Sequence, residues 1–158
     1  MKIRKIRPED DAALAEIVRY NLKKYGLDLP GTVYFDEGLD HLSEFYLSSP
    51  KRGYYVALDE NGAVAGGIGL AEFDGLACCA ELQKLYLTDA KKGNGFGYRL
   101  IDFIIQKAKE KGYARLYLET HTNLKAAIHM YEKSGFMEME RLPECVHTTM
   151  NRFYRMEL

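Results

Sequence analysis

The sequence predicts an α/β (α+β) fold, with helices on both faces of a mixed, mostly antiparallel sheet of about seven strands. Two observations lead to this fold class. The strand-like segments 54–58 and 63–72 flank a turn at 60–62 and therefore form an antiparallel hairpin. The segment 79–120 contains a strand, a helix and a strand, which requires a parallel pair. The expected element order is β-α-α-β-β-β-α-β-α-β-β.

The N-terminal third begins with a short strand at 2–7. A proline and three acids at 8–11 suit the first turn of a helix that ends near Gly26. The apolar residues of this helix recur at helical spacing, namely Leu14, Ile17, Val18 and Leu22. We expect a loop at 27–37 and a second, shorter helix at 39–47.

The rest of the chain alternates strands with two helices. The strands expected here cover 79–88, 114–120, about 136–142 and 151–158. Between them, one amphipathic helix ends at Gly112, and another is capped by Thr122-Asn123 and ends at Gly135. The return strand of the hairpin carries glycines that indicate a bulge or a close backbone approach: Gly66, Gly67 and Gly69.

Length and charge exclude several classes of protein. A chain of 158 residues predicts a single domain, 1–158. With 22 basic and 23 acidic residues, no net charge favours nucleic acid or an anionic membrane as a partner. No apolar run is long enough to span a bilayer, and the N-terminus lacks the apolar region of a signal peptide. Three cysteines, two of them adjacent, support neither a disulfide framework nor a zinc site, so we expect no metal and a cytoplasmic location.

The most informative segment is Lys-Gly-Asn-Gly-Phe-Gly-Tyr at 92–98, between a strand and a helix. Its glycines let the backbone wrap a ligand, and a helix N-terminus attracts phosphate. Lys91 and Lys92 add positive charge. The segment is not a dinucleotide fingerprint, because Tyr98 stands where the third glycine belongs, and the chain contains no nucleotide P-loop. Two interpretations of the segment remain: a site for another phosphate compound, or a glycine-rich helix start without a ligand.

Three segments in this order resemble the GNAT superfamily of acetyl-CoA-dependent N-acyltransferases. They are the strand Ala-Glu-Leu-Gln-Lys-Leu-Tyr-Leu at 80–87, the glycine turn at 92–97, and Asn123 followed by the helix Met-Tyr-Glu-Lys-Ser-Gly-Phe at 130–136. The turn matches the family pattern Arg/Gln-x-x-Gly-x-Gly/Ala, with Lys92 at the usual Arg or Gln position. The resemblance implies a GNAT fold and acetyl-CoA as co-substrate.

The resemblance also implies where coenzyme A lies. Its pyrophosphate would contact the amides of the glycine turn. Its pantetheine arm would pair with a strand edge that is left open where 79–88 and 114–120 splay apart. The expected coenzyme-binding residues are Leu85, Tyr86, Leu87, Lys92, Gly93, Asn94, Gly95, Phe96, Gly97, Tyr98 and Asn123.

Acetyl transfer to an amine needs a proton acceptor, because an amine with a pKa of ~10.4 is almost fully protonated at pH 7. It also benefits from a proton donor for the coenzyme A thiolate that leaves. By the resemblance, Glu81 is the candidate base, helped by burial or a relaying water; the alternative is an acid that only orients the substrate. Tyr131 matches the family's general-acid tyrosine, with plain packing as the alternative. Tyr34, Phe35 and His121 are candidates for acceptor binding or ordinary loop residues.

We therefore expect a cytoplasmic enzyme that transfers acetyl directly to a primary amine of a small molecule, such as an amino acid or a polyamine. No cysteine in the matched motifs has a histidine partner, so a covalent enzyme intermediate has no support. The alternatives are a peptide or protein N-acetyltransferase and a non-catalytic acyl-CoA sensor. We expect no nucleic-acid or membrane partner, and the sequence is compatible with a homodimer through the C-terminal strands.

Overall fold

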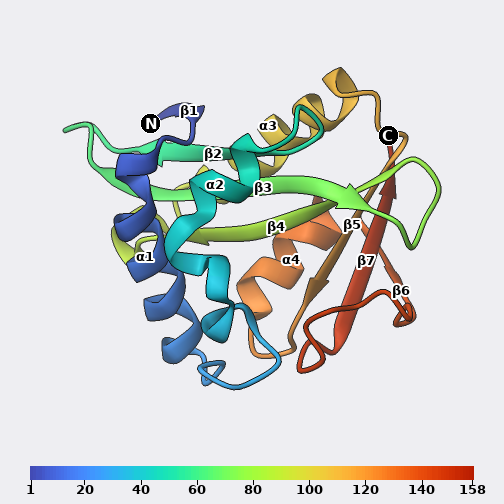
Figure 1. Ribbon diagram of the computed structural model, residues 1–158. Helices are drawn as coiled ribbons and strands as arrows, with labels where there is room; N and C mark the ends of the chain where they lie inside the picture. Colours follow the sequence, from blue (N-terminus) through green and yellow to red (C-terminus); the bar gives the residue numbers. More distant parts are fainter.

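Seven strands form one sheet through the centre of the molecule (Figure 1). The computed structural model describes residues 1–158. The strands are β1 (Lys2–Lys5), β2 (Gly53–Leu58), β3 (Val64–Phe73), β4 (Cys79–Leu87), β5 (Arg115–Thr120), β6 (Met137–Met139) and β7 (Arg152–Glu157). They lie in the order β1-β2-β3-β4-β5-β7-β6, and only β4 and β5 pair in parallel. The predicted mixed, mostly antiparallel sheet is confirmed.

Helices cover both faces of this sheet, as expected. They are α1 (Asp11–Lys24), α2 (Leu42–Leu47), α3 (Phe96–Glu110) and α4 (Lys125–Lys133). α3 and α4 pack against one face, and α1 and α2 pack against the other (Figure 1). Each face has its own apolar core: Leu100 and Ile104 belong to one buried cluster, Leu14 and Tyr46 to the other. Removing these side chains from water is the main force that holds the layers together.

The structure differs from the sequence prediction at the start of two helices. The segment predicted as one helix at 39–47 is a 3-10 turn over Glu37–His41 followed by the short α2. The predicted cap of α4 is wrong, because no side chain caps that helix. The amide of Asn123 instead donates to the backbone oxygen of Tyr25 at the end of α1 (3.0 Å). A tertiary contact therefore takes the side chain that local reasoning assigned to the helix start.

A bulge in β4 changes the face to which its side chains point. Opposite Gly67 and Gly69 of β3, β4 accommodates one extra residue, and Lys84 takes a left-handed φ of 50°. Before the bulge, Leu82 packs in the core beneath α3; after it, Leu85 packs there. Strict alternation would send these two side chains to opposite faces. The bulge predicted from the glycines of β3 is confirmed: β3 has one extra residue beside Gly66 in its pairing with β2, and β4 has one opposite Gly67 and Gly69.

β4 and β5 pair at one end only. Their register joins Cys79–Glu81 to Arg115–Tyr117. Beyond Glu81, β4 continues to Leu87 with no strand beside this edge. Buried backbone groups without partners are costly, so such an edge needs another chain or ligand beside it. The splay expected between these strands is confirmed.

Two properties of the chain bear on the classes considered above. No helix combines the length and the apolar character needed to cross a membrane. All three cysteines are free thiols, with Cys78 exposed, Cys79 buried and Cys145 half-buried. Burial raises the pKa of the Cys79 thiol to about 12, so this group stays protonated and unreactive at neutral pH.

Candidate active site

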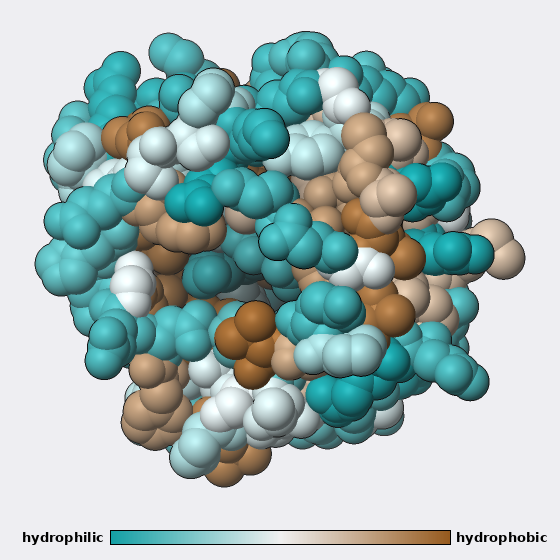
Figure 2. Space-filling view, turned by 45° about the vertical axis from the view of Figure 1, so that its right-hand side comes forward, coloured by the Kyte–Doolittle hydropathy of each residue, from teal (hydrophilic) through white to brown (hydrophobic).

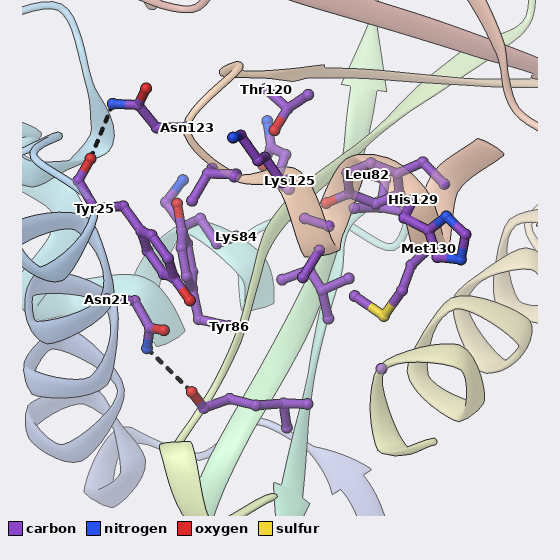
Figure 3. Close-up of a pocket in the computed structure, with 18 of the residues that line it drawn as sticks. Asn21, Tyr25, Leu82, Lys84, Tyr86, Thr120, Asn123, Lys125, His129 and Met130 are labelled. Carbon is purple, nitrogen blue, oxygen red and sulfur yellow. Dashed lines mark hydrogen bonds between the residues drawn. The ribbon is translucent and has the colours of Figure 1, made fainter. Parts of the chain in front are cut away.

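A cavity of about 630 Å³ lies where β4 and β5 part. Its walls come from β4, the end of β5, the glycine turn, α1, α4 and the loop between β6 and β7. Figure 2 shows a face of the molecule that is hollowed near its centre, with hydrophilic and hydrophobic residues meeting around the hollow. In Figure 3, Asn21 and Tyr25 of α1 lie on one side of the cavity, and His129 and Met130 of α4 lie on the other.

The structure brings most of the sequence-predicted site residues to this cavity. Those that line it are Glu81, Leu85, Tyr86, Leu87, Lys92, Gly93, Gly95, Gly97, Tyr98, Asn123 and Tyr131. Five do not line it. Asn94 is exposed, and Phe96 packs against the core beneath α3. The other three are the candidates for acceptor binding.

Tyr34, Phe35 and His121 stay away from the cavity because each has other surroundings. The rings of Tyr34 and Phe35 meet edge to face with centroids 5.0 Å apart, and Phe35 is 60% exposed. His121 uses its Nδ1 to accept the backbone N–H of Asn123 within its own loop (3.1 Å). The prediction that these three loop residues bind the acceptor is therefore not supported by their positions, because none of them lines the cavity.

The glycine turn presents backbone N–H groups to the cavity. From Gly93 to Tyr98, none of these groups donates to another backbone oxygen; the first such bond of α3 runs from Arg99 to Gly95 (3.1 Å). Gly95 stands directly before α3 with a φ of 75°, which side-chain-bearing residues rarely adopt. Gly97 lies close to α4, because a Cβ there would lie 2.5 Å from the sulfur of the flexible Met130 side chain. The turn thus has the unbonded N–H groups that suit an anion at a helix N-terminus, and it packs against α4.

Asn21 of α1 ties this end of the cavity together. Its Nδ2 donates to the Leu87 carbonyl (3.1 Å; Figure 3), and its Oδ1 accepts from the Lys92 ammonium (2.5 Å). Lys92 also pairs with Asp89 at 2.7 Å. Lys91, by contrast, pairs with Glu60 at 2.7 Å and does not line the cavity. Of the two lysines beside the turn, only Lys92 is placed to meet an anion.

Glu81 is the most perturbed carboxyl group of the cavity. Burial raises its pKa from 4.5 to about 7, and the negative charge of Glu119 acts in the same direction. The Gln83 amide donates to Glu81 Oε2 (2.8 Å), and the Tyr46 hydroxyl in turn donates to Gln83 Oε1 (2.6 Å). This chain fixes the orientation of the carboxyl group and leaves Oε1 without a protein partner. Near neutral pH, Glu81 can both accept and release a proton.

Glu119 and His147 form a second carboxyl centre that sequence reasoning did not find. His147 Nδ1 lies 3.0 Å from Glu119 Oε1, and its Nε2 lies 2.9 Å from Asp36 Oδ2. Burial alone lowers the pKa of His147, but its bonds to the two carboxylates outweigh this and raise the pKa to about 9. Burial likewise works to raise the pKa of Glu119, and the imidazolium keeps it below the usual value. The two glutamates of the cavity are therefore driven apart in pKa, which is typical of an acid–base site.

Tyr131 of α4 lines the cavity with its ring almost fully buried. The ring meets Phe136 edge-on, with centroids 5.9 Å apart. Burial raises the pKa of the Tyr131 phenol well above its ordinary value of 10.0, so the hydroxyl is protonated at neutral pH. The Tyr131 hydroxyl makes no hydrogen bond within the protein. Because every fully buried polar side-chain atom does have a partner, this hydroxyl is not fully buried, and it is open to the cavity. It is a proton donor without a competing partner.

Comparisons with known proteins agree with this geometry. The model of the acetyltransferase (GNAT) family matches residues 19–136. The N-acetyltransferase YjgM of Escherichia coli, itself uncharacterised, is 35% identical over 145 residues, which are 90% of this chain and 86% of that protein. The L-amino acid N-acyltransferase MnaT of Escherichia coli is 26% identical over 150 residues, 91% of this chain and 84% of that protein.

Solved structures show the same fold. A GNAT-family acetyltransferase from Staphylococcus aureus Mu50 matches with a TM-score of 0.88 at 23% identity, covering 99% of this chain and 98% of that chain. The family match spans the strand β4, the glycine turn and the Tyr131 helix that together enclose the cavity. The chain therefore belongs to the GNAT acetyltransferase family and is an acetyl-CoA-dependent N-acetyltransferase.

Proposed function

We propose that this enzyme transfers acetyl directly from acetyl-CoA to the primary amine of a small molecule, with Glu81 as base and Tyr131 as acid. One observation carries the proposal. A carboxyl group with a pKa near 7 and a protonated phenol line the same cavity, next to the open edge of β4. The cavity thus offers both a proton acceptor and a proton donor, which acetyl transfer to an amine requires.

The coenzyme fits the residues at the other end of the cavity. The unbonded N–H groups of 93–98 and the Lys92 ammonium suit a pyrophosphate. The unpaired edge of β4 at 85–87 suits the amides of a pantetheine arm, which would add to the sheet like a strand. The thioester then lies between β4 and β5, close to Tyr131. Asn123 borders the same space.

The amine must lose a proton before it attacks. Only about one amine molecule in a few thousand is neutral at pH 7 when its pKa is ~10.4. Glu81, which is partly ionised near pH 7, accepts this proton directly or through a water. The amine nitrogen then bonds to the acetyl carbon, and the carbon–sulfur bond breaks. Tyr131 donates its proton to the departing thiolate, whose conjugate thiol has a pKa near ~8.5. The second proton, which the nitrogen releases as it becomes an amide, restores the Tyr131 phenol.

A small acceptor is supported by the size of the cavity, since the coenzyme arm and the acceptor share about 630 Å³. It is supported as well by the relative named as an L-amino acid N-acyltransferase. A long peptide would have to pass the loop around His147, which hydrogen bonds hold to the α1–α2 loop.

The test is release of coenzyme A thiol from acetyl-CoA in the presence of amino acids, polyamines, aminoglycosides and short peptides. We expect a rate above the amine-free background with at least one small amine, and loss of that rate in Glu81→Gln. Binding of acetyl-CoA without turnover on any amine would contradict the proposal and favour an acyl-CoA sensor.

A further inference from the structure

The cavity contains a cation that neither coenzyme binding nor proton transfer explains. Lys84 lines the cavity from the bulge of β4 (Figure 3), yet its ammonium makes no hydrogen bond or ion pair within the protein. We propose that Lys84 binds a carboxylate of the acceptor, so that the substrate is an amino acid carrying its carboxylate close to the reacting amine. This inference rests on the proposed function and narrows its substrate class.

The position of Lys84 is fixed by the fold. A left-handed φ of 50° is unusual for a lysine, and strained backbone of this kind is concentrated at functional sites. The Tyr54 hydroxyl donates to the Lys84 carbonyl (2.9 Å) and holds the bulge in place. The ammonium lies 5.9 Å from the centre of the Tyr46 ring, on the α2 side of the sheet where Gln83 orients Glu81. The cation and the proposed base therefore share one side of the cavity.

The other cations of the cavity are accounted for. Lys92 lies beside the glycine turn, where we propose that it meets the pyrophosphate, and His147 is bound by two carboxylates. Lys125 is exposed, so water solvates it. Lys84 alone is a partly enclosed ammonium without a carboxylate partner. Lysine is rarely placed in such surroundings unless an anion pairs with it.

The charges that face Lys84 select between acceptor classes. Burial lowers the pKa of Lys84, and three carboxyl groups act against this to keep the ammonium charged: Asp36 from the α1–α2 loop, Glu81 from its own strand and Glu119 from β5. Asp36 and Glu119 share the His147 imidazolium, which leaves one net negative charge to balance Lys84. Ionised Glu81, the form that can accept a proton, faces the ammonium group of the acceptor, and Lys84 is the cation left to face a carboxylate. A polyamine would bring several positive charges next to Lys84, whereas a zwitterion offers its amine to Glu81 and its carboxylate to Lys84.

The first experiment uses the wild-type enzyme and matched acceptors. Each L-amino acid is compared with its carboxamide and with the amine that lacks the carboxylate, for example L-phenylalanine, L-phenylalaninamide and phenethylamine. A charge-assisted bond predicts kcat/KM about 10- to 100-fold higher for the amino acid. Because the carboxamide has the more readily deprotonated amine, its slower reaction cannot be attributed to amine protonation.

The second experiment changes the lysine. In Lys84→Gln we expect a raised KM for the amino acid and an unchanged or higher kcat/KM for the carboxylate-free amine, so that the preference falls to near unity. Lys84→Arg retains the positive charge and should retain most of the preference. Lys107→Gln is the matched control, since its ammonium pairs with Glu110 on the outer face of α3. Coenzyme A binding by each variant verifies its folding.

The outcomes separate the two proposals. Equal kcat/KM for amino acid, carboxamide and amine in the wild type would overturn the role of Lys84 and leave the N-acetyltransferase intact. Equal losses with both acceptor classes in Lys84→Gln would also overturn it, because a carboxylate contact must change the ratio. Absence of turnover with every amine would overturn the proposed function itself. If Lys84→Gln does not fold, the wild-type comparison still decides.

Discussion

The two ends of the cavity are built in different ways. The end that we propose for coenzyme A, the coenzyme end, takes its open strand edge and its N–H groups from one stretch of chain, 85–98, with Asn21 as a brace. The proposed acceptor end joins Asp36, Glu81, Glu119 and His147, which come from four separate segments. His147 is 28 residues from Glu119 and 111 from Asp36 along the chain. One end is therefore local in the sequence, and the other exists only in the folded chain.

This difference separates the binding of coenzyme A at one end from the selection of the amine at the other. The coenzyme end works through backbone groups, which most substitutions leave in place as long as the turn keeps its conformation. The acceptor end works through side chains, so single substitutions can change the amine that is accepted. Changes at the two ends should accordingly affect different kinetic parameters.

Glu81→Gln should give the largest effect. Removing a general base lowers kcat by about 10²- to 10⁴-fold, while acetyl-CoA affinity, measured by calorimetry, stays the same. In the wild type, kcat/KM should rise with pH through the region near 7, where Glu81 loses its proton. A variant with weaker coenzyme binding would contradict the separation of the two ends.

The same substitution has a distinct signature in stability. Folded Glu81 holds its proton up to about pH 7, whereas in the unfolded chain it ionises at its ordinary pKa of 4.5. Ionisation therefore favours the unfolded chain, and the wild type loses stability as pH rises between these two values. Glu81→Gln cannot ionise and should gain thermal stability relative to the wild type across this window. A less active but more stable protein would show that Glu81 serves the reaction rather than the fold.

Tyr131→Phe comes next. It removes the proton donor but keeps the ring packed against Phe136, so we expect kcat to fall by about 10²-fold with the coenzyme affinity nearly intact. Steady-state kinetics together with coenzyme titration provide the measurement. An unchanged kcat would reduce Tyr131 to a packing residue.

Gly95→Ala tests the coenzyme end. An alanine at a φ of 75° is strained by about 1–2 kcal/mol, which favours a turn with misdirected N–H groups. The KM for acetyl-CoA should rise by about tenfold and the KM for the amine should not change. Gly38→Ala is the control for coenzyme KM, because a Cβ there meets no atom within 4 Å. A selective rise in amine KM would break the comparison between the two ends.

His147→Gln should have the smallest effect, and one that depends on pH. The pKa of His147 is raised from 6.5 to about 9, so its ion pairs stabilise the fold fully below pH 6.5 and lose this contribution as pH rises through 9. We expect the melting temperature of the variant to be a few degrees lower than that of the wild type at pH 6. Each kcal/mol of lost unfolding free energy lowers the melting temperature of a domain of this size by about 2–4 °C. The gap should close above pH 9. A gap that is constant with pH would mean that His147 contributes through packing alone.

The sequence was sufficient wherever the signal is local. Turn residues and hydrophobic periodicity predicted the whole element order, and the spacing of the glycine turn predicted where α3 begins. The errors arose where a distant contact decides. Asn123 does not cap α4, because it reaches the end of α1, and Tyr34 and Phe35 turn toward each other instead of the cavity.

The candidate site was predictable to the same extent. Glu81 and Tyr131 stand in recognisable motifs, and both line the cavity. Glu119 and His147 carry no such signal, because their roles come from a pairing between β5 and a loop. Lys84 was hidden for another reason. The glycines indicated a bulge in β3, which the pairing with β2 shows, but they did not indicate that β4 also holds an additional residue.

The bulge also concentrates a consequence in one residue of β4. Deleting Lys84 would remove the extra residue and leave the ladder on either side of it in register. Leu82 and Leu85 would then be two positions apart, so simple alternation would keep both side chains beneath α3. The proposed coenzyme end would keep its strand edge, and the proposed acceptor end would lose its unpaired cation. Gain or loss of this one residue is therefore a route by which acceptor preference can change on this scaffold while coenzyme binding is retained.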